Sequence, residues 1–140
     1  MCIRDSDNTN NFGSAITFGA SDHSNGQTAQ AGIYTRSDGA YGTQMYFATT
    51  SSYSAGSYAR LMIDYNGHVL PTVNGNYDLG ASGKRWRNIY TSDLQLSNEG
   101  KTNDVDNTWG NYTIQEGESD LFLINNRNGK KYKFNLTEVS

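Results

Sequence analysis

Residues 121–134 read LFLINNRNGKKYKF, and this stretch decides the fold class. Apolar and polar residues alternate on both sides of Asn128-Gly129, and an Asn-Gly pair between alternating segments is the strongest short-range signal for a β-hairpin. A two-residue turn at this pair places Leu123 opposite Phe134. The stretch therefore predicts an antiparallel hairpin with one largely apolar face and one mixed face that meets water or a neighbouring chain.

The alternation continues upstream at 112–115, and 116–120 supplies a polar turn. Residues 110–137 are therefore predicted to form a three-stranded meander. A second Asn-Gly pair, Asn66-Gly67, predicts another hairpin, in which Ile63 lies opposite Leu70. Pro71 ends the Asn66-Gly67 hairpin and has no backbone N–H to donate, so we expect it at a sheet edge or a strand end.

Shorter alternating segments at 15–19, 31–36 and 42–49 are separated by polar loops rich in Gly, Ser and Asn. The predicted fold class is mainly β, with short antiparallel hairpins and meanders. The one helix candidate is 83–90, where Trp86, Ile89 and Tyr90 have helical spacing. We expect an antiparallel β unit at 7–73, a connecting unit at 74–98 and the C-terminal meander at 99–140.

The composition indicates a thin core. Leu, Ile, Val and Phe make up 24 of the 140 residues, whereas Asn, Gly, Ser and Thr are abundant and ten residues are Tyr. Thin cores are usually supplemented by disulfides, metals or oligomerisation. A single Cys excludes an internal disulfide, so we expect self-association. A net charge of -3 without a basic stripe argues against nucleic acid, and no apolar run is long enough for membrane insertion.

Residues 1–6, MCIRDS, match neither a signal peptide nor the pattern that follows. This hexapeptide resembles the translation of a transposon-end adaptor used in sequencing libraries. We interpret it as a non-native artefact, so we expect the natural chain to continue upstream and this chain to be a metagenomic fragment. The only Cys lies within the hexapeptide. The credible chain is then free of cysteine.

Two segments resemble the distal part of bacteriophage tail fibres. Residues 58–71, YARLMIDYNGHVLP, are similar to a fibre unit in which an Arg-x-x-Ile-Asp strand enters a Gly-containing hairpin. Residues 76–96, NYDLGASGKRWRNIYTSDLQL, are similar to the next unit, which has a Tyr-Asp-Leu-Gly strand, a basic-Trp turn and an Ile-Tyr strand. Residues 109–139 also resemble the C-terminal tail of marine phage fibres.

The resemblance implies a structural, non-enzymatic protein located in the virion tail fibre, which forms an intertwined homotrimer and presents or forms the host-contacting tip. Within the motif it implies that Asp78 and Leu79 start a strand and that Gly80 permits a bend. It also implies that Trp86 fills the interior and that the strand resumes at Ile89 and Tyr90.

Many fibres with this Trp unit continue into a self-cleaving chaperone that opens on a Ser-Asp pair, and Ser92-Asp93 stands in the corresponding place. The chain then departs from that pattern, because Leu94-Gln95-Leu96 replaces the usual basic residues and the remainder has a β pattern. We therefore expect no self-cleavage. A remnant of such a chaperone region remains an alternative function.

No candidate for chemistry is convincing, and we expect no catalytic residue, no cofactor and no metal. Asp22-His23-Ser24 holds the residue types of a hydrolytic triad, but adjacent residues cannot converge as acid, base and nucleophile. His68 lies in the Asn-Gly hairpin and suits a surface role. Asp104 and Asp106 offer oxygen ligands for calcium but lack the glycine and terminal glutamate of a calcium loop.

Two further sets of charged residues are better explained by solvation. Glu116 and Glu118 flank Gly117 in a predicted turn, where they cover a sheet edge rather than form a glycosidase pair. The basic cluster of Lys84, Arg85 and Arg87 forms at most a small anion patch. It is expected to lie in a solvated turn or to pair with Asp78 or with acidic groups of a neighbouring protomer.

Aromatic residues suit either cross-strand packing or stacking on sugar rings. Tyr41, Tyr53 and Tyr58 lie beside Gly/Ser loops and are the candidates for glycan contact. The expected partners are further copies of the chain and a host polysaccharide or outer-membrane receptor. The competing function is a free β-sandwich carbohydrate-binding module, which predicts a monomer.

Overall fold

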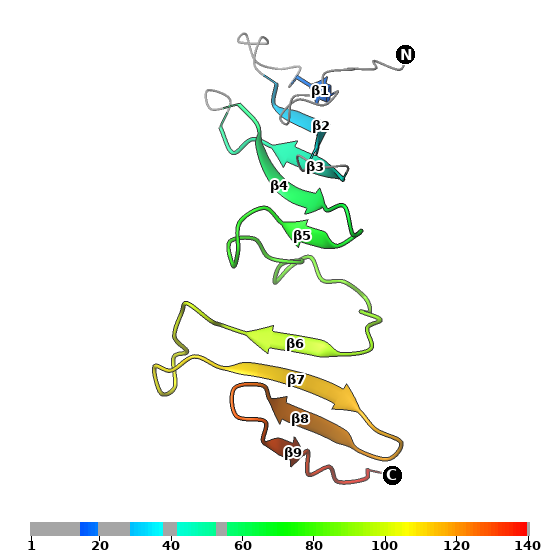
Figure 1. Cartoon of the computed structure of the whole chain (residues 1–140), viewed down its shortest axis with the longest axis vertical. Coiled ribbons are helices and arrows are strands. Elements are labelled where there is room, and N and C mark those ends of the chain that lie inside the picture. The colour runs from blue at the N-terminus through cyan, green and yellow to red at the C-terminus, as the bar shows by residue number, and fades with distance from the viewer. Residues whose placement is uncertain (1–14, 20–28, 38–41, 53–55, 140) are drawn as a thin grey trace. The chain divides into compact units, whose positions relative to one another are not determined.

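The structure of the chain is a computed structural model, and it describes residues 15–19, 29–37, 42–52 and 56–139. These residues form nine β-strands and no helix, arranged in two antiparallel sheets (Figure 1). The predicted fold class is confirmed. The strands are β1 (Ala15–Phe18), β2 (Ala31–Ser37), β3 (Thr43–Thr49), β4 (Tyr58–Ile63), β5 (Val69–Pro71), β6 (Leu94–Ser97), β7 (Asn111–Glu116), β8 (Leu121–Asn125) and β9 (Lys131–Lys133).

The chain divides into two compact units, residues 1–84 and 85–140. The first contains a five-stranded sheet in the order β1-β2-β3-β4-β5, and the second a four-stranded sheet in the order β6-β7-β8-β9. Both are meanders, since each strand pairs with its neighbour in sequence (Figure 1). The C-terminal meander therefore has one strand more than expected, because β6 pairs with β7.

Of the two hairpins, the one around Asn66-Gly67 comes first in the chain and is called the first hairpin, and the one around Asn128-Gly129 is called the second. The first hairpin has a register one residue away from the predicted one. Ile63 lies opposite Val69, and Leu70 lies opposite Met62. Because side chains alternate along a strand, this single-residue difference moves Leu70 to the other face of the sheet. The prediction for Pro71 is confirmed, since Pro71 ends β5, the last strand of its sheet.

The loop conformation explains the difference in register. The Gly67 N–H donates to the Asp64 carbonyl at 3.0 Å, and the Asp64 N–H donates to the His68 carbonyl at 3.0 Å. These bonds close a three-residue loop with Gly67 in the left-handed conformation, at a φ of 86°. A two-residue type I′ turn needs positive φ at both central residues, and among described non-glycine residues only Asn107 has one.

The second hairpin differs from its predicted register by two residues. Leu123 lies opposite Tyr132 rather than Phe134. The Gly129 N–H donates to the Asn125 carbonyl at 2.8 Å, which closes a four-residue loop. A shift of two residues leaves every side chain on its predicted face, because the side-chain period of a strand is also two.

The predicted helix at 83–90 is wrong. A two-residue turn starts the segment, where Ala81 and Lys84 exchange two backbone hydrogen bonds of 3.0 Å, and no regular element follows before β6. A helix this short cannot repay its nucleation cost without an apolar surface to pack against. Among the described residues there is accordingly no helix long and apolar enough to cross a membrane.

The strands implied by the fibre motif are also absent from this segment. Asp78 and Leu79 start no strand, and Ile89 and Tyr90 resume none. Gly80 has a φ of 95°, a backbone conformation that glycine adopts readily. The segment is therefore an irregular chain with side chains that its own unit does not bury.

Within the described residues, neither sheet has a second layer in its own unit. Every pair of strands in substantial contact consists of hydrogen-bonded neighbours of one sheet. Across the described ranges, Ala48 is the only buried hydrophobic residue and Thr113 the only buried polar one. This agrees with the thin core expected from the composition.

Replacing Gly67 by Ala is expected to destabilise the first hairpin. An added Cβ meets nothing within 4 Å at Gly67, so the cost comes from the left-handed backbone alone, and it is about 1 kcal/mol. Gly83→Ala is the matched control, because its Cβ also meets nothing and its φ lies outside the left-handed region. Urea unfolding of both variants tests this; equal destabilisation would contradict it.

Candidate binding surfaces

The first sheet has one apolar face. Strand pairing places one row of apolar side chains side by side across all five strands and a second, shorter row next to it. Its outer members are largely open, with Ile16 and Val69 each 63% exposed. We call this set apolar face 1: Ile16, Ile33, Phe47, Leu61, Pro71, Met45, Ile63 and Val69.

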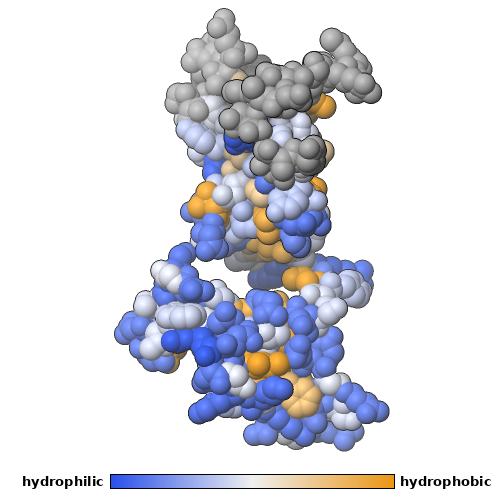
Figure 2. Space-filling view, in the orientation of Figure 1, coloured by the Kyte–Doolittle hydropathy of each residue, from blue (hydrophilic) through white to orange (hydrophobic). Residues whose placement is uncertain are grey.

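The second sheet repeats this arrangement. One row of side chains crosses all four strands, and two shorter rows lie on either side of it. Leu94 is 45% exposed and Leu96 is 46% exposed, so the face is open at its β6 edge. We call this set apolar face 2: Leu94, Ile114, Leu123, Tyr132, Leu96, Tyr112, Leu121 and Phe134. Figure 2 shows hydrophobic surface in the open on both units.

The opposite face of the second sheet is held by side-chain hydrogen bonds. Thr113 donates to Gln95 Oε1 at 2.7 Å, and Asn126 donates to both Thr113 and Asn111 at 2.9 Å. Gln115 donates to the Asp93 carboxylate at 3.0 Å. Thr113 is 5% exposed, and Phe122 and Ile124 of β8 lie on this same face. The opposite face is therefore mixed, with a hydrogen-bonded polar network beside two apolar side chains, whereas apolar face 2 consists of aliphatic and aromatic side chains.

A cation flanked by two aromatic rings lies on the first sheet. The Arg60 guanidinium carbon lies 5.8 Å from the ring centre of Tyr58 and 5.4 Å from that of Tyr77. Arg60 also donates a 3.0 Å hydrogen bond to the Tyr77 hydroxyl. This bond is the main cause that lowers the pKa of Tyr77 below its ordinary value of 10.0, because it stabilises the phenolate. We call these three residues the Arg60 cluster.

A β-bulge sets the direction of Arg60. Phe47 pairs with Leu61, but the next residue of β3, Ala48, pairs with Ala59. Arg60 is therefore the extra residue of β4 and has no partner on β3. Bulges re-aim side chains and are frequent beside functional sites. No sequence pattern marks this bulge, and neither Arg60 nor Tyr77 is among the predicted site residues.

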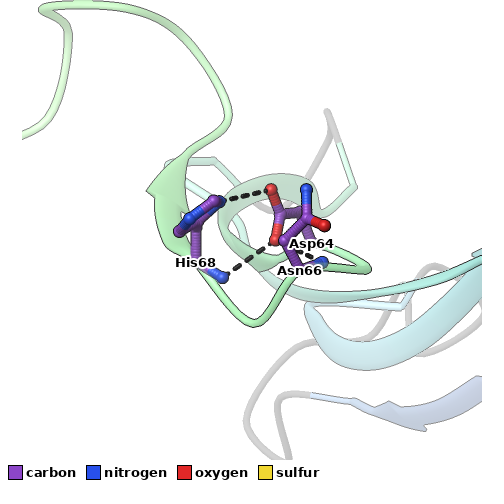
Figure 3. A network of polar contacts seen from close by, with 3 residues as sticks. All are labelled: Asp64, Asn66 and His68. Atoms are coloured by element: carbon purple, nitrogen blue, oxygen red, sulfur yellow. Dashed lines mark hydrogen bonds and ion pairs between the residues drawn. The ribbon is translucent and has the colours of Figure 1, made fainter.

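The Asp64 carboxylate organises the first hairpin loop (Figure 3). It accepts bonds from the Asn66 N–H at 2.9 Å, the His68 N–H at 2.8 Å and the His68 ring at 3.0 Å. Burial opposes its ionisation, but these bonds from His68 and Asn66 outweigh burial and lower the pKa of Asp64. The role of this network is structural, and His68 is an exposed partner within it.

The loop at 103–108 uses its oxygens internally. Asp106 Oδ1 accepts bonds from the Asn103 side chain at 2.7 Å, the Thr108 hydroxyl at 2.8 Å and the Thr108 N–H at 3.0 Å. The bonds from Asn103 and Thr108 lower the pKa of Asp106. Among the described residues, no group of three or more His, Cys, Asp or Glu is placed to hold a metal ion.

The remaining charged candidates lie apart from any catalytic arrangement. Asp93 accepts the Gln115 bond, and its carbonyl accepts the Thr91 hydroxyl at 2.8 Å, so the Ser92-Asp93 pair precedes a sheet rather than a helical domain. Glu116 and Glu118 are exposed on either side of Gly117, whose N–H donates to the Asp120 carbonyl at 2.7 Å.

The basic cluster at 84–87 does not pair with Asp78. Between described residues the ion pairs are His68–Asp64 and Lys133–Asp120. Lys84, Arg85 and Arg87 are exposed. Pairing with a neighbouring protomer stays a prediction.

The aromatic motif residues of the connecting segment are exposed in the single chain. Trp86 is 63% exposed and Tyr90 is 92% exposed, and Leu79 and Ile89 are similarly open. Of the glycan candidates, Tyr58 is 54% exposed within the Arg60 cluster. Tyr41, Tyr53 and the Asp22-His23-Ser24 triplet lie outside the described residues, as does the 1–6 hexapeptide.

A second arginine stacks on an aromatic ring in the other unit. The Arg127 guanidinium carbon lies 3.9 Å from the Trp109 ring centre, and Arg127 donates to the Trp109 carbonyl at 2.7 Å. Both contacts hold the β8–β9 loop against one residue. This pair serves as a reference for the Arg60 cluster, which has two rings instead of one.

Comparison with solved structures finds similarity to the carboxy-terminal domain of the bacteriophage T5 L-shaped tail fibre with its intra-molecular chaperone domain. The TM-score is 0.53 and the identity 24%, over 70% of this chain and 27% of that chain. A structure of the carboxy-terminal domain of that fibre gives a TM-score of 0.48 and 26% identity, over 58% of this chain and 32% of that chain. The chain thus spans a third or less of either.

The first of these similarities shows a shared fold. No protein-family model matches the chain, and no curated protein sequence matches it.

Replacing Asp64 by Asn is expected to weaken the first hairpin at neutral pH and to flatten its acid dependence. The pKa of Asp64 is lower in the folded state, so its stabilising contribution is present above its unfolded pKa of about 3.8 and is lost as the pH falls through the folded pKa. Urea midpoints at neutral and acidic pH measure this. Asp78→Asn, an exposed carboxylate of the same unit, is the control and should keep the wild-type profile.

Proposed function

We propose that this chain is a structural, non-enzymatic element from the distal part of a bacteriophage tail fibre. Copies of the chain associate through their apolar faces, and the assembly presents or forms the tip that contacts the host. Its location is then the tail fibre of the virion. The observation that carries this proposal is the pair of one-layer sheets, each with one apolar face that the described residues of its own unit leave uncovered.

Self-association would bury the open apolar faces of both sheets against the same faces of other copies. An isolated sheet with one apolar face loses the stabilisation of burial, which amounts to about 25 cal/mol for each Å² of apolar surface removed from water. Copies of one chain present the same face, so rotation about a common axis brings identical surfaces together and closes the assembly. The resemblance to tail fibres supports three copies.

The chemistry of the two faces supports this direction of packing. Apolar face 2 carries leucines and aromatic rings, whereas the opposite face of the sheet carries the hydrogen-bonded Thr113, Gln95 and Asn126. The opposite face also carries Phe122 and Ile124, but burying it would enclose the charged Lys131 and Lys133, which lie opposite them on β9. In the proposed trimer the apolar faces therefore point to the axis and the opposite faces point outward.

The sequence motifs and the shared fold support the same role. The 58–71 and 76–96 units resemble tail-fibre units, and the fold is similar to part of a phage tail-fibre domain. In the proposed trimer, Trp86 and its exposed neighbours in the motif lie against neighbouring copies.

Sedimentation equilibrium of the full chain is expected to give a trimer. Leu123→Gln is expected to weaken assembly, because it places an amide on apolar face 2 and loses about 2 kcal/mol of apolar burial per copy. Ile124→Gln is the matched control, since Ile124 is the next residue of β8, is also half-buried and points to the opposite face. It should retain the trimer.

Two outcomes would overturn the proposal. A stable monomer would contradict shared burial and favour the free carbohydrate-binding module. Loss of assembly in Ile124→Gln but not in Leu123→Gln would place the interface on the other face.

A further inference from the structure

We propose that the Arg60 cluster binds an acidic sugar, specifically a hexuronate residue whose carboxylate pairs with Arg60 while its ring lies against tyrosine. This deepens the proposed function, on which the choice of a host glycan as partner rests. The site consists of Arg60 on the β4 bulge, Tyr58 two residues before it and Tyr77 from the segment after β5.

The Arg60 guanidinium has hydrogen-bond donors that the described residues do not use. Arg60 forms no ion pair with any carboxylate in the described ranges, and its guanidinium donates one hydrogen bond there, to the Tyr77 hydroxyl. An arginine side chain carries five N–H donors in a planar fork that matches a carboxylate. A half-buried cation with an uncharged partner is a ready site for an anion, since the pair would form in partly dehydrated surroundings.

The two rings define the rest of the ligand. Tyr58 and Tyr77 flank the cation at similar distances, and Tyr58 is 54% exposed. A tyrosine ring offers an apolar face beside a hydroxyl, which suits the C–H faces and hydroxyl groups of a pyranose. A ligand with both a carboxylate and a pyranose ring uses all three side chains. A simple anion uses the arginine alone.

The cluster is accessible in the single chain, where Tyr58 is 54% exposed and Arg60 and Tyr77 are half-buried. Arg60 is the extra residue of the β4 bulge, so strand alternation does not assign it to one face of the sheet. A titration of the assembled chain measures directly whether the site is open in the assembly. The chain as a whole carries a net charge of -3, so general attraction to a polyanion is not expected and binding must come from a local site.

Calorimetric titration of the full chain with hexagalacturonate at low salt tests the site, with maltohexaose as the neutral probe. We expect binding of the uronate, weakening with added salt, and no measurable binding of maltohexaose. Arg60→Gln should weaken uronate binding by about tenfold to a hundredfold, the effect of losing a hydrogen bond to a charged group. Arg60→Lys keeps the charge but not the fork, so it should fall in between.

Two controls separate the site from general charge or aromaticity. Arg127→Gln removes the other arginine that stacks on a ring, and Tyr65→Ala removes another exposed tyrosine of the same unit. Both should bind like the wild type. Tyr58→Ala should lose several-fold in affinity while the bond from Arg60 to Tyr77 stays in place. It therefore tests the site even if Arg60→Gln unfolds the loop.

The proposal is overturned if the wild type does not bind hexagalacturonate, if maltohexaose binds equally well, or if Tyr58→Ala binds like the wild type. Equal losses in Arg60→Gln and Arg127→Gln would also overturn it, because they indicate general charge attraction. Sedimentation of each variant distinguishes failure of the sugar site from failure of the proposed fibre role. An intact trimer without binding removes the sugar site alone, whereas a monomeric wild type removes the proposed fibre role.

Discussion

A β-sheet one layer thick leaves its apolar face in water unless another surface covers it, and both sheets of this protein are subject to that constraint. The rows through Ile33 and Phe47 in one sheet and through Ile114 and Leu123 in the other are continuous apolar bands. Hydrogen bonds between strands hold each sheet together but bury almost no side chain, as Ala48 shows by standing alone as a buried hydrophobic residue in the described ranges. In the function we propose, the missing layer is supplied by further copies of the chain.

Turn geometry decides which side chains belong to those bands. In the first hairpin, a three-residue loop that ends in a left-handed Gly67 puts Val69 beside Ile63 and sends Leu70 to the other face. The four-residue loop that ends at Gly129 changes its register by two residues and leaves the faces as they were. Because the side-chain period of a strand is two, a register shift by an odd number of residues moves side chains to the other face, whereas a shift by an even number leaves them on the same face.

Side chains outside the apolar rows make other contacts. In the second sheet the polar groups satisfy one another, while in the first sheet a bulge turns Arg60 toward two tyrosines and away from any carboxylate in the described residues. In the functions we propose, the apolar rows serve self-association and the Arg60 cluster serves ligand contact. The bulge makes this combination possible, because it interrupts the regular alternation of side chains along β4.

From the sequence alone follow the antiparallel β class, the two hairpins, the place of Pro71 at a sheet edge and the thin core, because these depend on local alternation, turn residues and composition. The sequence could not determine the loop types at Gly67 and Gly129, the pairing of β6 with β7, or the absence of the helix at 83–90, because each depends on contacts with residues elsewhere in the chain. Tyr58 was a candidate from its position beside a Gly/Ser loop. Only the tertiary structure joined it to Arg60 and Tyr77, since a bulge and a loop contact 17 residues apart leave no periodic trace in the sequence.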